Sequence, residues 1–431
     1  MHLQRIYDYS LRILIGILPF TTFLSVFTSQ KLGIPGVSFL KEGLIFVMLF
    51  CLFIGYVQGK IKIQWTKYDF LIGVYVILLA CITLFTTGIS GLVYGGRYDF
   101  EFLVVFFVVF HGFIFLSRPA SYYIRIFLIS GGIALFLGML LKWPLSEDIL
   151  LYFGYSGNPS NWQFGSAVPI FHGVEGANIR RFQGLFDGPN TMGAFLLLYI
   201  GVFVYYFRNY KAWHFVIGGI VLLFIACIIY TYSRSALLGL FGGVGFIILF
   251  SGRYLYQNFP KQTIALALIA LLGIGGIFLQ YGGNIKAIIE RGGSSKGHAE
   301  RMLIGVQRSV SHPLGQGLGS AGPAYRHVLD LAGKEKNEIE KTDTYYIPES
   351  WYIQQFIEGG FLGGFIFLIL MGFILFGLFR VHVILSGMFI SILIMNFFLH
   401  TFESSMLSLS LFIVIGLYLA SYSSRGSHAS R

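Results

Sequence analysis

Charged residues are scarce in this sequence, since Asp, Glu, Lys and Arg make up only 11% of its 431 residues. A soluble globular protein carries about 25%. Hydrophobic residues reach 56% and aromatic residues 18%, and Gly (54) and Phe (45) are abundant, as in helices that pack within lipid. The composition excludes secreted, disordered and cytosolic proteins and predicts a polytopic membrane protein.

Cysteine is also rare, and acidic residues are outnumbered. The three cysteines, Cys51, Cys81 and Cys227, lie in apolar runs without the spacing of a disulfide or a metal site. The net charge of +11 comes from 30 basic and 19 acidic residues. The basic residues stand at the ends of apolar runs, so they indicate membrane topology and a site for anionic lipid-linked groups rather than nucleic acid. The outer loops lack His-x-x-x-His and Asp-x-Asp, so we expect no metal and no cofactor.

Long apolar runs predict an all-α fold of about twelve transmembrane helices, because a spanning helix needs about 20 mostly apolar residues. The predicted spans are 12–29, 40–58, 68–87, 101–117, 123–141, 190–207, 213–231, 236–251, 262–280, 352–378, 383–401 and 405–421.

Basic residues in the short connections place both termini in the cytoplasm. Two long segments, 142–189 and 281–351, then lie on the outer side of a single transmembrane domain that covers 1–431. The second loop is predicted to be helical over 298–310 and over 323–332, with a glycine-rich turn at 314–322. Most of the outer polar chemistry lies in these loops, so function is expected to face outward from the membrane.

Two outer connections contain arginines suited to bind phosphate. Arg181, next to Arg180, stands nine residues before Asn190 and the following span. A guanidinium bonds phosphate oxygens in pairs and stays charged, although an interfacial arginine that only extends to the membrane surface would look the same. Arg234 lies in a short outer connection, against the positive-inside rule. It needs an anionic partner, either a substrate or an acidic side chain.

The second loop adds a possible diphosphate clamp. Arg301 and Arg308 are seven residues apart and share one helix face, with His298 one turn ahead. The alternative is the solvated face of a loop helix.

Glu349 is the candidate for acid–base chemistry. It precedes the span 352–378 among aromatic residues that include Tyr345 and Trp351. These surroundings predict a raised pKa, suited to taking a proton from a sugar hydroxyl. Glu349 could instead cap the helix that follows. Other polar residues near outer span ends are expected to be structural partners of the outer arginines: Asp99, Glu101, Glu358, His400 and Glu403.

Four blocks together resemble the O-antigen ligase and O-antigen polymerase (Wzy-type) family. They are Arg181-Phe-Gln-Gly-Leu-Phe-Asp-Gly-Pro-Asn190, Tyr232-Ser-Arg-Ser-Ala-Leu237, His312-Pro-Leu-Gly-Gln-Gly-Leu-Gly319 and the segment from Glu349-Ser-Trp to Gly363. The blocks cover roughly the second half of the chain, and the first five spans match only in hydropathy.

The resemblance implies a GT-C-like, metal-independent glycosyltransferase that uses undecaprenyl-diphosphate-linked oligosaccharide on the periplasmic face of the bacterial inner membrane. Arg181 and Arg301 would bind the diphosphate, with Arg234 as a further candidate, and Glu349 would activate the acceptor hydroxyl. Asn190, Tyr345 and Trp351 are further candidates for substrate binding, and aromatic residues in the loops could stack on sugar faces. The ligases look to carry a histidine at the position of Glu349, which favours a polymerase whose acceptor is another lipid-linked repeat. A chain-length regulator protein is a candidate partner. The alternatives are a ligase that transfers glycan to lipid A-core and a transporter of lipid-linked sugars.

Overall fold

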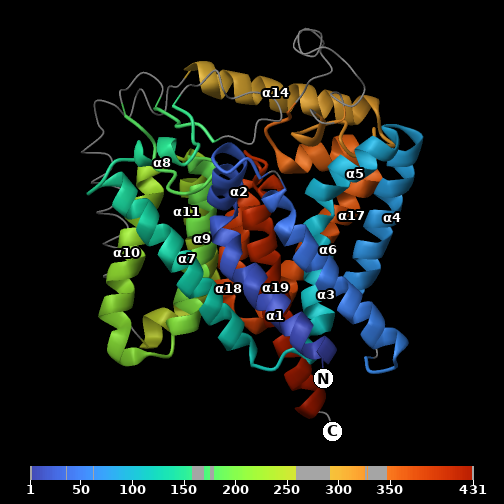
Figure 1. The fold of residues 1–431 in the computed structure, drawn as a ribbon, viewed down its shortest axis with the longest axis horizontal. Coiled ribbons are helices and arrows are strands. Elements are labelled where there is room, and N and C mark those ends of the chain that lie inside the picture. The colour runs from blue at the N-terminus through green and yellow to red at the C-terminus, as the bar shows by residue number, and fades with distance from the viewer. Residues whose placement is uncertain are drawn as a thin grey trace.

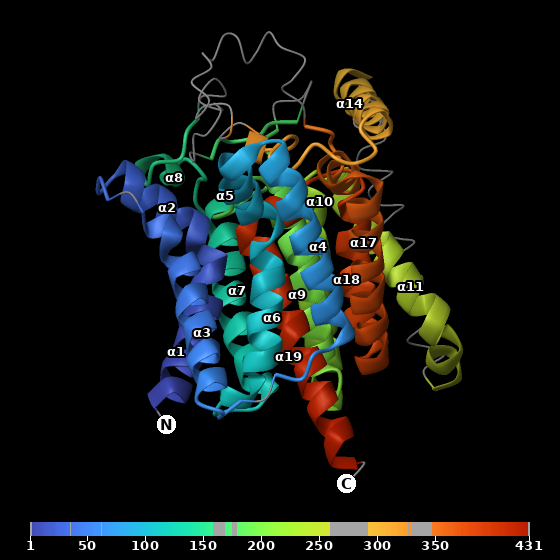
Figure 2. The same cartoon turned by 90° about the vertical axis from the view of Figure 1, so that its right-hand side faces the viewer.

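The computed structural model describes residues 2–34, 36–61, 63–157, 169–174, 179–258, 292–325, 328 and 347–429. Within these residues the regular structure is helical, and β pairing is limited to two isolated bridges, Ser156 with Ile170 and Gly173 with Arg180. The helices form an upright bundle, with α14 (Gly292–Ser311) lying across one end (Figures 1 and 2). Both chain termini lie at the opposite end (Figure 1). We call the end that bears α14 the α14 face.

Nine helical segments in the described part are long and apolar enough to cross a membrane, or ten if one bent pair is counted as a span. The nine are His2–Gln30, Leu40–Val57 (α3), Lys67–Phe85 (α4), Ala120–Lys142 (α7), Pro189–Phe207 (α9), Lys211–Tyr230, Arg234–Ser251, Trp351–Val381 (α17) and Ser405–Ser424. The first combines α1 (His2–Ile17) with α2 (Thr21–Gln30), and the sixth contains α10 (His214–Tyr230). The seventh and ninth lie in α11 (Arg234–Asn258) and α19 (Ser405–Ala429).

The predicted all-helical membrane fold is confirmed, and three of the predicted spans need comment. The region of 101–117 is the second arm of a pair bent by 56°, formed by α5 (Gly88–Asp99) and the segment Glu101–Phe115, which includes α6 (Glu101–Gly112). The sequence analysis did not predict α5. The region of 383–401 contains α18 (Val383–Met395), which is a shorter apolar helix. The predicted span 262–280 lies outside the described residues.

The last of the described helices along the chain occupies the centre of the bundle. In the most apolar stretch of α19, 83% of the residues are buried, against 17% in that of α10, so α19 is interior and α10 is peripheral. Helix α19 contacts α6, α7, α9 and α17.

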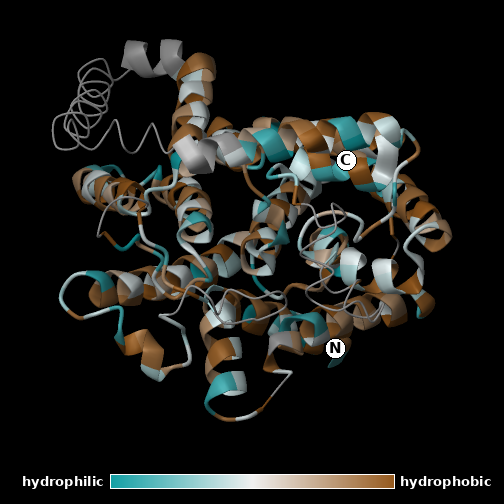
Figure 3. Cartoon of the chain, turned by 90° about the horizontal axis from the view of Figure 1, so that it is seen from above, coloured by the Kyte–Doolittle hydropathy of each residue, from teal (hydrophilic) through white to brown (hydrophobic). Residues whose placement is uncertain are grey.

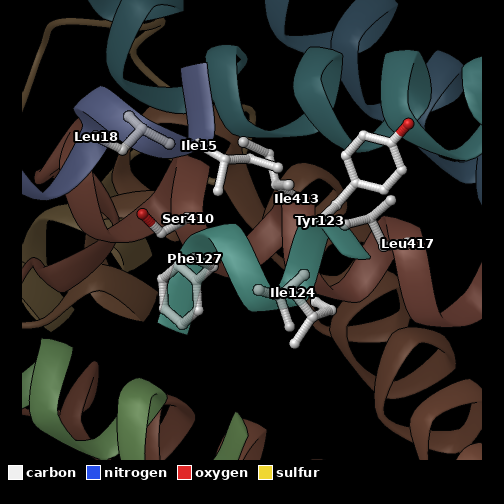
Figure 4. Close-up of a pocket in the computed structure, with 9 residues that line it drawn as sticks. Ile15, Leu18, Tyr123, Ile124, Phe127, Ser410, Ile413 and Leu417 are labelled. Atoms are coloured by element: carbon white, nitrogen blue, oxygen red, sulfur yellow. The ribbon is translucent and has the colours of Figure 1, made fainter. Parts of the chain in front are cut away.

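Small residues let neighbouring helices approach closely, as is common where lipid supplies no hydrophobic drive between helices. A Cβ at Gly243 of α11 would lie 2.4 Å from the carbonyl oxygen of Gly387 in α18. A gap remains where α1, α7 and α19 meet, between side chains such as Ile15, Phe127 and Ile413 (Figure 4). This gap is too narrow for a water molecule, so we interpret it as a packing defect.

Candidate active site on the α14 face

Glu349 sits in a strained turn immediately before α17. Its φ is +52°, in the left-handed region that residues with a Cβ rarely adopt. Such a conformation costs of order 1–3 kcal/mol and persists only where the surrounding contacts enforce it. Strain of this kind in a polar residue is a feature of functional sites.

Both oxygens of the Glu349 carboxylate are engaged by α14. Arg301 forms an ion pair with Oε1, and the His298 Nδ1 atom lies 3.1 Å from Oε2. The Glu349 side chain is only 14% exposed, whereas that of Arg301 is 50% exposed. The carboxylate is therefore held inside the protein, while the guanidinium remains accessible to a ligand.

The charge state of Glu349 differs from the sequence prediction. Burial raises the pKa of the carboxyl group, but the hydrogen bond with His298 and the charges of His298 and Arg301 outweigh this effect, and the net pKa is lowered. The predicted increase was wrong because the sequence did not show that α14 would bring a cation to the carboxylate. Glu349 is thus ionised at neutral pH, as a general base must be.

A third group reaches Glu349 from the turn that follows α18. His400 interacts electrostatically with Glu349, and burial lowers the pKa of His400 to about 4. Its Nε2 atom is buried and has no hydrogen-bond partner among the described residues. Asn396 fixes the turn, because its carbonyl oxygen accepts from Trp351 N at 3.0 Å and its Oδ1 accepts from Thr401 N at 3.1 Å. From the sequence, His400 was expected to be a structural partner of the outer arginines, and its position beside the carboxylate was not predicted.

Trp351 has a packing role in this structure. Its side chain is fully buried, and its ring packs against Phe102, Phe402 and His400. The suggestion that Trp351 binds substrate by stacking on a sugar is therefore wrong for this conformation, because no ring face is exposed. Tyr345, the other aromatic candidate, lies outside the described residues.

The glycine-rich turn after α14 fits into a break in α17. Gly360 has φ +62° and ψ −169°, which interrupts the helix. The backbone groups freed by the break bond to the turn: Gln316 N donates to Ile357 O, Gly317 N donates to Glu358 O, and Phe361 N donates to Pro313 O, each at 2.9 Å. A break near a membrane needs such replacement partners. This pairing fixes the end of α14 against the helix that begins beside Glu349.

Replacing Gly360 with Ala is expected to weaken this junction severely. A Cβ there would lie 2.4 Å from the carbonyl oxygen of Pro313 and would also have to adopt the left-handed φ. We expect a large fall in the yield of monodisperse protein in size-exclusion chromatography. Gly372→Ala is the matched control, because a Cβ at that position of α17 meets nothing within 4 Å. Equal yields from both variants would contradict this account of the junction.

Arg308 stabilises the same turn from α14. Its guanidinium bonds to the Gln316 side chain and to the Ser320 carbonyl oxygen at 3.3 Å. Of the two predicted clamp arginines, Arg308 thus contacts the loop and Arg301 contacts the carboxylate.

Two carboxyl groups, those of Glu358 and Asp99, are buried near the glycine-rich turn. Glu358 accepts from Gly319 N at 2.9 Å, and Asp99 accepts from the Gln355 side chain at 2.7 Å. These contacts are with backbone and amide groups, so the expectation that Asp99 and Glu358 pair with outer arginines was wrong. The local sequence did not show that the carboxyl groups of Asp99 and Glu358 would lie close to each other.

Arg181 belongs to a second group, where α9 begins and α10 ends. Its Nε donates to the Thr231 carbonyl oxygen at 2.8 Å, and its Nη2 donates to Asn190 Oδ1 at 2.9 Å. Arg181 and Asn190, nine positions apart in the sequence, are thus joined by a direct hydrogen bond. The guanidinium is thus held by two separate elements.

Arg234 is the first residue of α11. The turn that precedes α11 brings it near the group around Arg181. The turn follows Thr231 and packs on α9, because a Cβ at Gly193 would lie 2.8 Å from the Ala236 Cβ atom. Tyr232 has φ +50°, the second strained residue with a side chain in the described chain. Arg234 is half-buried at this junction.

Arg180 faces a different environment from that of Arg181. Its Nη1 lies 2.7 Å from Asp148 Oδ1 in an exposed ion pair, and its guanidinium lies over the Phe171 ring, 4.4 Å from the centroid. The Arg180 side chain therefore contacts described residues of the 142–189 loop, Asp148 and Phe171.

The group around Glu349 and the group around Arg181 are linked by one short segment of the chain. The segment Thr401–Glu403, which directly follows His400, contacts α9, whose first turn contains Asn190. The loop before α9, the α8 helix (Ile149–Tyr152) in it and α14 lie at the same end of the bundle (Figure 1). The cationic candidates Arg181, Arg234 and Arg301 thus lie on the α14 face, which also bears Glu349.

Part of the chain matches a known protein family. Residues 218–368 match the family model described as O-antigen ligase. The match includes α14, the glycine-rich turn, Glu349 and the first half of α17. A search of curated protein sequences gave no match.

Proposed function

We propose that this chain, whose residues 218–368 match the O-antigen ligase family model, is a membrane glycosyltransferase that polymerises undecaprenyl-diphosphate-linked oligosaccharide repeats. The observation on which this proposal rests is the contact of Arg301 and His298 with a buried, ionised Glu349. One site then contains a base for a hydroxyl group and a cation for a diphosphate. We place the α14 face on the periplasmic side of a bacterial inner membrane, with both termini in the cytoplasm.

The proposed reaction is a direct transfer. A hydroxyl of the acceptor repeat attacks the anomeric carbon of the donor, the bond from that carbon to the diphosphate oxygen breaks, and the hydroxyl proton passes to Glu349. The lipid diphosphate leaves with the bonding electron pair. Arg301 and Arg181 stabilise the negative charge that develops on it, and such preorganised stabilisation is a large contribution to catalysis.

Arg301 has to change partners in this scheme. In this structure it is paired with Glu349, and half of its side-chain surface is exposed to a ligand. A diphosphate has a greater negative charge than one carboxylate and accepts bonds in pairs. Donor binding would therefore draw Arg301 away from Glu349, free the Oε1 atom for the acceptor hydroxyl, and raise the pKa of the base.

A purified chain in lipid nanodiscs tests the proposal. We expect it to lengthen a defined lipid-linked repeat without metal or an energy source, which a transporter would not do. Failure to elongate any lipid-linked repeat, together with transfer to lipid A-core, would show that the chain is a ligase.

The ligase is the second candidate because the matching family model is described by that activity. The carboxylate of Glu349, at the position where the resemblance to ligases predicts a histidine, favours the polymerase. A deletion strain separates the two functions. Loss of a polymerase leaves one repeat unit on the lipid A-core, whereas loss of a ligase leaves none.

The pH dependence of elongation should report the lowered pKa of Glu349. Because a carboxylate with a lowered pKa stays ionised in more acidic solution, kcat/KM of the wild type should fall only below the ordinary value of 4.5. His298→Ala removes the hydrogen bond that lowers this pKa, so its kcat/KM should begin to fall at a higher pH. His312→Ala, at an exposed position just after α14, is the control. If kcat/KM fell at the same acidic pH in the wild type and in His298→Ala, Glu349 would be excluded as the titrating base.

A further inference from the structure

Helix α14 has three distinct sides, which follow from a rotation of about 100° per residue. The first side faces the protein. It contains His298 and Arg301, which contact Glu349, Arg308, which contacts the glycine-rich turn, and the buried Gly305 and Ser309. The polar chemistry of this helix is thus directed inward.

The second side is apolar and exposed. Leu303, Val306 and Val310 are 60%, 47% and 62% exposed, and their spacing places them on one stripe, opposite Arg301. Leu314, just beyond the helix, is 84% exposed. Single exposed apolar residues are ordinary, but a continuous stripe marks a contact surface for protein or lipid.

The third side is polar and forms an edge beside the apolar stripe. It consists of Glu300, Gln307 and Ser311, all of which are exposed, and Ile304, 41% exposed, lies between this edge and Arg308. A helix with one apolar side, one polar side and little overall hydrophobicity is typical of helices that lie in the plane of a membrane surface.

The apolar stripe continues onto an exposed apolar surface of α17. The hydrogen bond from Phe361 N to Pro313 O, at 2.9 Å, places Leu314 next to α17. The outward residues Phe361, Leu362 and Phe365 of α17 are 40%, 61% and 56% exposed, as expected for the side of a spanning helix in contact with acyl chains. Seen along the bundle axis, α14 runs along one edge of the molecule (Figure 3).

We propose that α14 is an interfacial helix that binds the surface of the lipid bilayer through Leu303, Val306 and Val310. The polar edge of Glu300 and Gln307 faces water, and the helix lies at the depth of the lipid headgroups. Arg301 is thereby held at the level at which the phosphates of any membrane-borne ligand lie. This inference concerns the position of the helix and stands independently of the proposed reaction.

Site-directed spin labelling of the full chain in nanodiscs tests the proposal. Cys51, Cys81 and Cys227 are first replaced by Ala, and single cysteines are then introduced as Leu303→Cys and Val310→Cys. The matched controls on the same helix are Glu300→Cys and Gln307→Cys. Accessibility to oxygen, which partitions into lipid, is compared with accessibility to a water-soluble nickel chelate.

We expect oxygen to relax the labels at 303 and 310 more strongly than nickel does, and the reverse at 300 and 307. Nickel accessibility as high at 303 and 310 as at 300 and 307 would place the helix in water and overturn the proposal. Labels at 303 and 310 that neither reagent reaches would also overturn it, because protein would then cover the stripe. Elongation activity does not enter these measurements, so they remain informative if the proposed reaction is wrong.

Discussion

Glu349→Gln is expected to abolish polysaccharide elongation and at the same time to tighten binding of the donor diphosphate. The amide is close in shape to the carboxylate but cannot accept the hydroxyl proton, and loss of a general base costs about 10²–10⁴-fold in rate. The amide also has no charge with which to retain Arg301. The diphosphate then no longer competes with a carboxylate for the guanidinium.

Two measurements check this prediction. Elongation of a defined lipid-linked repeat gives the rate, and calorimetric titration of nanodisc-embedded protein with farnesyl diphosphate gives the affinity. Glu300→Gln, which removes a carboxylate from the exposed side of α14, is the matched control and should change neither quantity. A normal elongation rate in Glu349→Gln would disprove its role as base. A slow variant with unchanged affinity would show that base and diphosphate do not compete for Arg301.

Arg181→Ala is expected to reduce elongation by about 10²–10³-fold, the usual effect of removing one donor that stabilises developing charge. Arg180→Ala provides a control one residue away, because Arg180 is paired with exposed Asp148 and surface ion pairs contribute little to stability. Its elongation rate should stay near that of the wild type. Arg181→Lys should recover only part of the rate, because a lysine cannot reproduce the paired bonds of the guanidinium.

A structural effect of Arg181→Ala has to be separated from a catalytic one, since Arg181 also binds the Thr231 carbonyl oxygen. Asn190→Ala removes the neighbouring contact of Arg181 without removing the charge, so it should raise KM for the donor more than it lowers kcat. The elution profile and the Tm of each variant provide the folding control. Arg181→Ala protein that folds normally and elongates at the wild-type rate would remove Arg181 from the site.

The spanning helices could be predicted from the sequence because lipid imposes a length and a composition on each one. The bend between α5 and α6 escaped this reasoning. Its glycine-rich first arm is not apolar enough to predict a span, and Gly91 and Gly95 in this arm pack closely against the distant residue Leu318.

The residues of the candidate site could also be selected from the sequence, but their partners could not. Arg301 and Glu349 are 48 positions apart and meet because the glycine-rich turn fits the break at Gly360. Two glycine-rich segments gave no sign that they would pair with each other. The lowered pKa of Glu349 follows from that pairing, so a prediction from the aromatic neighbours alone had the wrong sign.

The central place of α19 has a consequence for biosynthesis. A membrane chain is inserted from its N-terminus onward, yet the helix that fills the middle of this bundle follows all the other described spans in the sequence. The earlier helices must therefore remain loosely associated in the bilayer until Ser405–Ala429 has been synthesised and inserted among them. A nascent chain stopped before residue 405 would lack its interior, and we expect quality-control proteases to remove it.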